Sequence, residues 1–344
     1  MSNEPEPAWM VYRCVEKALA DLSPLDLVLV ACSGGADSLA LAAAAASLCA
    51  SGKVRAGAVI IDHQLQSGSG DVAVEAARQC RSLGLEPVER LSVDVRSGPG
   101  IGGPEAAARD ARRSALLSAA DRHNAKALLL GHTLDDQAET VLLGLARGSG
   151  ARSLAGMASV DGRWRRPLLG CRRAVVRAAC AAAGLNPHED PHNADPAFSR
   201  VRVRQEVLPM LEEQLGPGIA GALARTAQLL RSDTEALDGW AERELAERIA
   251  GTEPDITVEI GRGASSLGQL PQAVRTRVIR LAALRAGCPP GSLTQSHLAA
   301  ADKLISAWRG QGAVRLTANR ELLRASDKLV INDAGPLKPT TESV

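Results

Sequence analysis

The chain is poor in aromatic residues, in clustered cysteines and in net charge. One Phe, one Tyr and four Trp in 344 residues leave few side chains on which nucleobases could stack. The seven cysteines include no C-x-x-C pair, which argues against a zinc ribbon or a dithiol redox centre. A formal net charge of +1 argues against a uniformly basic protein. Any polyanion site must therefore be local.

Long hydrophobic runs are also missing. The run at 39–46 is too short to span a bilayer, and no signal peptide opens the chain. We therefore expect a cytoplasmic protein without a membrane partner. The length predicts two or three domains with enough residues to bury a core.

The lysine of a Walker A loop is absent as well, although a glycine-rich loop is present. The sequence S-G-G-A-D-S follows an apolar run at 27–31 and precedes a helix-like stretch. The glycines permit close approach to a ligand, and the helix start offers free N–H groups to an anion. Asp37 would repel phosphate unless a cation such as Mg²⁺ bridged them. The loop resembles that of the PP-loop ATP pyrophosphatases, and the resemblance predicts ATP binding at Ser33, Gly34, Gly35, Ala36, Asp37 and Ser38.

The first 150 residues alternate between strand and helix patterns. We expect strands at 26–32, 54–61, 86–93 and 126–131, and helices at 37–50, 71–84, 104–123 and 135–147. This alternation predicts an α/β fold with a doubly wound, mainly parallel sheet. Ligands of such sheets bind at the carboxyl ends of the strands, where the sequence places the glycine-rich loop, Asp62-His63 and Gly131-His132.

The later part of the chain has a different pattern. Residues 218–250 predict one long helix with a polar face, broken at 251–254. A smaller α/β unit follows, with expected strands at 255–261, 313–317, 320–325 and 328–332 and helices at 270–286 and 294–309. The tail from Gly335 is rich in Pro, Thr and Ser, which is typical of disorder.

Acidic residues cluster just after the fourth expected strand. The stretch 131–140 reads G-H-T-L-D-D-Q-A-E-T. Asp135 would cap or open the next helix, which explains one carboxylate structurally. Asp136 and Glu139 stand three residues apart, on one helix face. Paired carboxylates beside a phosphate loop would hold Mg²⁺ or an ammonium group.

Three other features allow two interpretations. Glu105, Arg109 and Arg112 have the spacing of a surface ion-pair helix as well as that of an anion site. His63 could be structural. An arginine-rich stretch with one acid, Asp161, is either a polyanion footprint or a solvated face; its members are Arg147, Arg152, Arg163, Arg165, Arg166, Arg172, Arg173 and Arg177.

Together these motifs resemble the tRNA(Ile)-lysidine synthetase family over roughly residues 25–212. The matching segments are the loop at 33–38, D-H-Q-L-Q at 62–66, the E-x-x-x-R-x-x-R helix at 105–112, G-H-x-x-D-D-Q-x-E-T at 131–140, R-P-L-L at 166–169 and D-x-x-N-x-D at 190–195 with Arg200. Gln66 and Ser114 depart from the family pattern, and Gln66 could weaken one phosphate contact.

The resemblance implies a ligase reaction. ATP adenylates the C2 oxygen of the wobble cytidine in CAU-anticodon tRNA(Ile), and free L-lysine then displaces AMP, changing codon reading from AUG to AUA. It implies Mg²⁺ at Asp37 and Asp136, with lysine on Glu139 or with these two roles swapped. Arg109 and Arg112 would hold a cytidine phosphate, His132 would position the adenylate or lysine, and Asp62 and His63 would belong to the ATP site.

The resemblance also implies a division of the chain. We expect a PP-loop ATP-pyrophosphatase catalytic domain at 1–212, a linker helix at 213–252, a small α/β tRNA-binding domain at 253–334 and a disordered tail at 335–344. A homodimer is left open.

Three alternatives are weighed against this function. A tRNA thiolase needs cysteines for an iron–sulfur cluster, and the cysteine spacing here does not provide them. An ammonia-using PP-loop ligase would not need the arginine-rich stretch and the appended domain. A non-catalytic tRNA-binding protein would not need the carboxylates at Asp37, Asp136 and Glu139.

Overall fold

The computed structural model describes residues 6–62, 68–93 and 104–334. It divides the chain into two compact units, Met1–Arg231 and Ser232–Val344. The expectations for His63, Gln66 and the tail at 335–344 lie outside the described residues.

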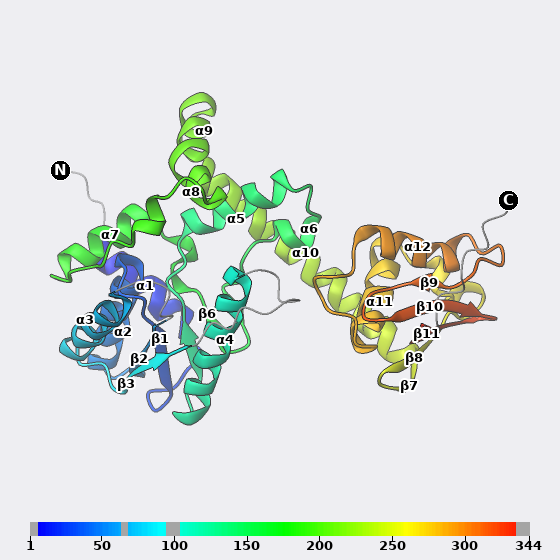
Figure 1. Ribbon diagram of the computed structural model, residues 1–344, viewed down its shortest axis with the longest axis horizontal. Coiled ribbons are helices and arrows are strands. Elements are labelled where there is room, and N and C mark those ends of the chain that lie inside the picture. Colours follow the sequence, from blue (N-terminus) through cyan, green and yellow to red (C-terminus); the bar gives the residue numbers. More distant parts are fainter. Residues whose placement is uncertain (1–5, 63–67, 94–103, 335–344) are drawn as a thin grey trace. The chain divides into compact units, whose positions relative to one another are not determined.

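The first unit is built on a six-stranded sheet in the order β3-β2-β1-β4-β6-β5 (Figure 1). Its strands are β1 (Leu27–Ala31), β2 (Arg55–Asp62), β3 (Val88–Ser92), β4 (Ala127–Leu129), β5 (Val160–Asp161) and β6 (Trp164–Arg165). All neighbours are parallel except β5 and β6. The predicted mainly parallel sheet is confirmed, and the short antiparallel β5–β6 edge was not foreseen.

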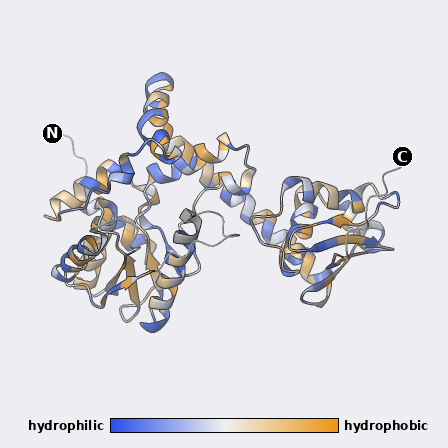
Figure 2. Cartoon of the chain, viewed as in Figure 1, coloured by the Kyte–Doolittle hydropathy of each residue, from blue (hydrophilic) through white to orange (hydrophobic). Residues whose placement is uncertain are grey.

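Helices cover both faces of this sheet, and β1 is therefore buried on both sides. Val28 and Val30 point into a core shared with α1 (Pro7–Ala18), α2 (Ala36–Ala50), α3 (Ser69–Ser82) and α7 (Arg173–Ala182). Leu27 and Leu29 point into the opposite core, which α4 (Pro104–Arg122) covers. The alternation follows from the two-residue period of a strand, and it explains why β1 reads as an unbroken apolar run (Figure 2).

A helical region follows the sheet within the first unit. It contains α5 (Leu134–Ala146), α6 (Ala151–Leu154), α8 (Ser199–Arg202) and α9 (Leu208–Leu215), with 3-10 turns at Pro167–Gly170 and Pro191–Ala194 and a π-helical turn at Val203–Val207. The long helix α10 (Ile219–Arg248) confirms the helix expected at 218–250. Of the helices described here, the sequence did not predict α1, α6, α7, α8 and α9.

The second unit is an antiparallel sheet in the order β7-β8-β11-β10-β9 with two helices (Figure 1). The strands are β7 (Ile249–Thr252), β8 (Asp255–Glu259), β9 (Val314–Arg315), β10 (Arg320–Ala325) and β11 (Lys328–Asp333), and the helices are α11 (Gln272–Arg285) and α12 (Gln295–Ser306). Short 3-10 turns lie at Gly263–Ser265 and Leu267–Gln269. The predicted small α/β unit is confirmed, and the expected break at 251–254 covers the end of β7 and the turn of a β7–β8 hairpin.

Within the described ranges, no helix combines the length and the apolar character that a membrane crossing requires.

Candidate active site

The glycine-rich loop and the residues after β4 pack directly against each other at the carboxyl ends of β1 and β4. Gly34 has a φ of +82°, which favours glycine. A Cβ at Gly131 would lie 3.1 Å from the backbone carbon of Asp37 and 3.2 Å from the amide nitrogen of Ser38. The two segments can approach this closely because Gly131 has no side chain.

Hydrogen bonds within the loop hold its shape. Ser38 Oγ donates to the carbonyl of Gly35 at 2.9 Å and accepts from the amide of Ser33 at 3.1 Å. The amide of His188 donates to the carbonyl of Gly34 at 2.9 Å. Gly35 is the N-cap of α2 and has no side chain to satisfy the first helical amides. These amides can therefore bind an anion.

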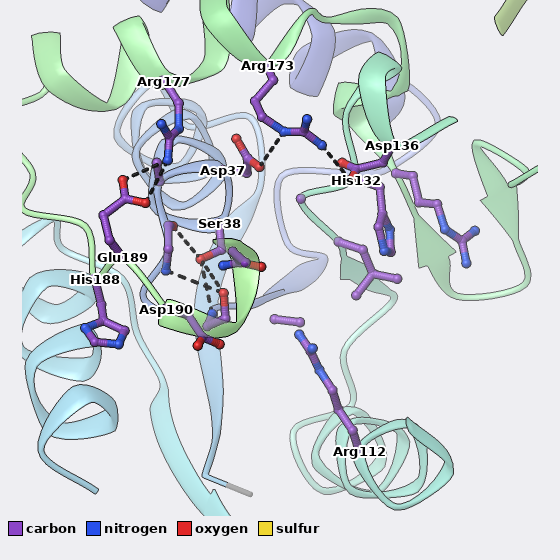
Figure 3. Close-up of a pocket in the computed structure, with 18 of the residues that line it drawn as sticks. Asp37, Ser38, Arg112, His132, Asp136, Arg173, Arg177, His188, Glu189 and Asp190 are labelled. Atoms are coloured by element: carbon purple, nitrogen blue, oxygen red, sulfur yellow. Dashed lines mark hydrogen bonds and ion pairs between the residues drawn. The ribbon is translucent and has the colours of Figure 1, made fainter. Parts of the chain in front are cut away.

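A cavity of about 800 Å³ opens at this edge of the sheet (Figure 3). It brings together most of the predicted site residues, namely Ser33, Gly35, Ala36, Asp37, Ser38, Arg109, Arg112, His132 and Asp136. Figure 3 shows Arg112 entering from the side opposite Arg173 and Arg177. Side chains from α4 and from α7 therefore face the same cavity.

The start of α5 is organised by Thr133 rather than by Asp135. Thr133 is the N-cap, and its side chain accepts from the amide of Asp136 while Asp136 accepts from the amide of Thr133. Asp135 instead accepts from Arg172 Nε at 3.2 Å and from the amide of Arg173 at 2.6 Å. Asp135 lies in the first turn of α5, as expected, but it does not cap the helix, because its carboxylate ties α5 to the start of α7.

Three arginines surround the second predicted carboxylate, Glu139. Its side chain is 0% exposed, and it accepts from Arg173 at 3.0 Å, Arg200 at 2.9 Å and Arg204 at 2.7 Å. It is not among the residues that line the cavity. The structure therefore does not support direct contact between Glu139 and lysine, because guanidinium groups already occupy both carboxylate oxygens.

Asp37, Asp136 and His132, which line the cavity, have shifted pKa values. Burial raises the pKa of Asp37 to about 6, although the charge of Arg173 opposes the shift. Burial also disfavours ionised Asp136, but Arg173 and hydrogen bonds from Thr133 outweigh it and hold the pKa of Asp136 below the usual carboxyl value. Burial lowers the pKa of His132 to about 4, so this imidazole is neutral at pH 7.

Two of these groups have buried atoms without a hydrogen-bond partner. They are Oδ1 of Asp37 and Nδ1 of His132. Such atoms are costly unless a ligand pairs with them. They therefore indicate where a bound substrate or cation makes contact.

The opposite wall of the cavity is basic. Arg109, Arg112, Arg113 and Arg166 line it, and the Arg113 guanidinium carbon lies 4.7 Å from the ring centroid of Trp164. Burial lowers the pKa of Arg166, whose Nε is buried without a partner. The cavity thus has one wall where carboxylates are paired with arginines and one wall of guanidinium groups.

Most of the arginine-rich stretch at 147–177 is paired with acids that are distant in sequence. Arg163 pairs with Asp121, and Arg165 donates to Asp21 at 2.7 Å. Arg172 contacts Asp135, and Arg173 contacts Asp136. Arg177 contacts Glu189. The stretch is therefore not an unpaired basic face, although Arg163, Arg172 and Arg177 are still 43–55% exposed, and its contact with phosphates stays a prediction. The fold supplies acids that the local sequence lacks.

A second cavity of about 410 Å³ adjoins the glycine-rich loop near the end of β2. Ala31, Ser33, Ile61, Asp62 and Asn193 are among the residues that line it. Ser69 Oγ donates to Asp62 Oδ1 at 2.7 Å. The placement of Asp62 beside the loop therefore fits a nucleotide site.

The donor set fits a Mg²⁺ ion that is shared with a nucleotide. Asp37 and Asp136 both line the larger cavity, and Asp37 Oδ1 has no partner. Within the described ranges, no group of three or more His, Cys, Asp or Glu side chains is placed to hold a metal. Mg²⁺ is commonly held by one or two carboxylates together with substrate phosphates.

Sequence reasoning missed several residues that shape the site. Arg173, Arg177, His188 and Glu189 line the larger cavity, and Arg204 lines it as well while it contacts Glu139. Arg173 and Arg177 are members of the predicted arginine-rich stretch, but the sequence does not reveal the partners of these side chains.

Comparisons with known proteins agree with this geometry. A PP-loop domain profile matches residues 10–211, and a profile described as the TilS substrate binding domain matches residues 264–330. A tRNA(Ile)-lysidine synthase of Thermobifida fusca (strain YX) is 52% identical over 332 residues, 96% of this chain and 99% of the relative. One of Streptomyces coelicolor is 54% identical over 324 residues, 93% of this chain and 89% of the relative.

A solved structure shares the fold of the first unit's family at low sequence identity. The U34-tRNA thiolase of Methanococcus maripaludis, described with its 4Fe-4S cluster, has a TM-score of 0.55 and 20% identity, covering 65% of this chain and 80% of that one. All seven cysteines of the present chain lie in the described ranges and are free. Because two domain profiles match in order and both lysidine synthases share about half of their residues with nearly all of this sequence, the chain belongs to the tRNA(Ile)-lysidine synthase family.

Proposed function

We propose that this protein joins free lysine to C2 of the wobble cytidine in CAU-anticodon tRNA(Ile), using ATP and Mg²⁺. The observation that carries this proposal is the two-walled cavity at the glycine-rich loop. One wall suits a metal-bound polyphosphate and an ammonium group, and the other suits the phosphates of a nucleic acid. Family membership supports the same reaction.

The first step transfers AMP to the tRNA. The C2 oxygen of the cytidine attacks the α-phosphorus of ATP, and the bond to the β-phosphate oxygen breaks to release pyrophosphate. The loop at 33–38 and the start of α2 bind the departing phosphates through amides and hydroxyls. Asp37 and Asp136 would hold Mg²⁺, which supplies charge neutralisation to the phosphates. The adenosine occupies the smaller cavity beside Asp62.

The second step transfers lysine. Its ε-amine attacks C2, the bond from C2 to the oxygen breaks, and AMP leaves with that oxygen. The ammonium form of lysine needs a carboxylate before it loses its proton, and the cavity offers Asp136 and Asp190. We assign Glu139 to the positioning of Arg173, Arg200 and Arg204. The neutral His132 positions the adenylate or lysine through its unpartnered Nδ1.

The tRNA contacts both units in this proposal. Arg109 and Arg112 receive phosphates near the wobble nucleotide, and the second unit binds the tRNA body. A homodimer and a cytoplasmic location remain part of the proposal.

The decisive experiment is incubation with ATP, Mg²⁺, labelled lysine and purified CAU-anticodon tRNAs. We expect label in the isoleucine tRNA and none in the methionine tRNA that shares its anticodon. Omission of ATP is the control. ATP-dependent release of AMP without lysine incorporation would instead indicate a different PP-loop enzyme.

A further inference from the structure

Arg173 lies between the two carboxylates that are assigned to the metal. Its Nη2 is 2.9 Å from Asp136 Oδ1 and 3.0 Å from Glu139 Oε1, and its Nε is 3.9 Å from Asp37 Oδ2. Figure 3 shows the guanidinium reaching toward Asp37 on one side and Asp136 on the other. The side chain is 18% exposed and lines the cavity. A cation of the protein therefore already contacts both proposed ligands.

The charges of this cluster balance. Three carboxylates, Asp37, Asp136 and Glu139, face three guanidinium groups, and the formal sum is zero. The guanidinium groups belong to Arg173, Arg200 and Arg204. Affinity for a divalent cation depends on the negative charge of its ligands. A neutral cluster offers a free Mg²⁺ ion little attraction that would offset the loss of its water.

A nucleotide changes this balance because a triphosphate brings several negative charges to the start of α2. Of the three contacts of Arg173, the one to Asp37 is the longest, and Asp37 Oδ1 has no partner. Arg177, one turn further along α7, lines the same cavity. Arg173 can therefore exchange carboxylate oxygens for phosphate oxygens without leaving the cavity.

We propose that Arg173 is a built-in counter-cation of the empty site, so that the protein takes up its divalent cation together with the nucleotide and not before it. This inference rests on the assignment of Asp37 and Asp136 to the metal in the proposed function. It makes Arg173 a positioning residue with two partners, the carboxylates in the empty state and the polyphosphate in the loaded state. The backbone of Arg173 stays fixed meanwhile, because its amide donates to Asp135 at 2.6 Å.

Binding of Mn²⁺ to the full chain tests this inference, with electron paramagnetic resonance reporting the free ion. Without nucleotide, the wild-type protein should bind Mn²⁺ only in the millimolar range, which is typical of weak carboxylate sites. A non-hydrolysable ATP analogue should produce a protein-bound Mn²⁺ signal that the analogue alone does not give. One Mn²⁺ bound tightly by the nucleotide-free wild type would overturn the inference.

Variants locate the effect. Arg173→Gln should strengthen Mn²⁺ binding by the nucleotide-free protein at least about tenfold, because one unit of positive charge leaves the two ligands. Arg173→Lys keeps the charge and should show no gain. Arg172→Gln is the matched control, since Arg172 pairs with Asp135 outside the cluster. The double variant Arg173→Gln with Asp37→Asn should lose what Arg173→Gln gained.

The outcomes separate this inference from the proposed function. Equal Mn²⁺ affinity in wild type and a folded Arg173→Gln variant would refute the counter-cation role. Should Arg173→Gln fail to fold, as circular dichroism would show, the wild-type comparison with and without the analogue still decides. Lysine incorporation into tRNA by the wild type is measured independently, so its presence or absence does not depend on this result.

Discussion

Replacement of Glu139 by Gln removes one negative charge from the centre of three guanidinium groups. The carboxylate is 0% exposed and contacts Arg173, Arg200 and Arg204 within 3.0 Å. Breaking a buried ion pair by neutralising one partner costs about 3–5 kcal/mol. Arg200 is 42% exposed and can recover water, so we expect a loss near the lower limit, about 3 kcal/mol.

Differential scanning calorimetry of the full chain measures this loss. For a unit of this size, 1 kcal/mol corresponds to roughly 2–4 °C, so the melting temperature of the first unit should fall by roughly 6–12 °C. Glu213→Gln, at an exposed position of α9, is the control and should change little. Adding Arg200→Gln to Glu139→Gln restores the charge balance and should recover part of the loss.

One result would refute this reasoning. If Glu139→Gln melts like the wild type but raises the KM for lysine strongly, Glu139 releases its arginines and contacts the substrate. The role first expected for Glu139 from the sequence would then be correct, and the arginine contacts would belong to the empty state alone.

Four further substitutions make three more tests. Asp37→Asn should abolish tRNA adenylation. The same change should stabilise the ligand-free protein by up to about 3 kcal/mol at pH 7, because burial raises the pKa of Asp37 to about 6 and the ionised carboxylate therefore destabilises the fold at pH 7. That gain should shrink as the pH falls from 6 toward 3.8, because the folded carboxyl is already protonated in this range whereas the unfolded carboxyl becomes protonated only near 3.8. A gain that calorimetry finds equal at pH 7 and pH 5 would contradict this reasoning. Arg165→Ala should lower the free energy of unfolding by about 1 kcal/mol and leave the salt dependence of tRNA binding unchanged. Arg109→Ala should instead flatten the slope of log K for tRNA against log salt by about one unit. Equal slopes for both variants would count against the basic wall. Gly131→Ala should raise the KM for ATP, since its Cβ would lie 3.1 Å from the backbone of Asp37, and an unchanged ATP titration would show that the loop tolerates the shift.

The PP-loop fold and its chemistry were readable in the sequence because they depend on local signals. The unbroken apolar run at 27–31, the glycine-rich loop and the helix after it specify a strand, a turn and a helix start within about twenty residues. The loop after β1, Asp62 at the end of β2 and the polar residues after β4 then fall at one sheet edge, because parallel strands end on the same side. The location of the cavity follows from these patterns.

The partners of the charged residues depended on tertiary structure. A stretch with eight arginines and one acid looks basic in sequence, yet Asp21, Asp121 and Asp135 neutralise much of it after folding. Glu139 looked like a site carboxylate, and only the approach of Arg200 and Arg204 from a distant segment placed it behind the cavity. The two partners of an ion pair are often far apart in the sequence, so residue spacing along one helix does not determine which charges pair. The sequence by itself therefore determined which chemistry gathers at this edge, and the tertiary structure decided which charges remain free to perform it.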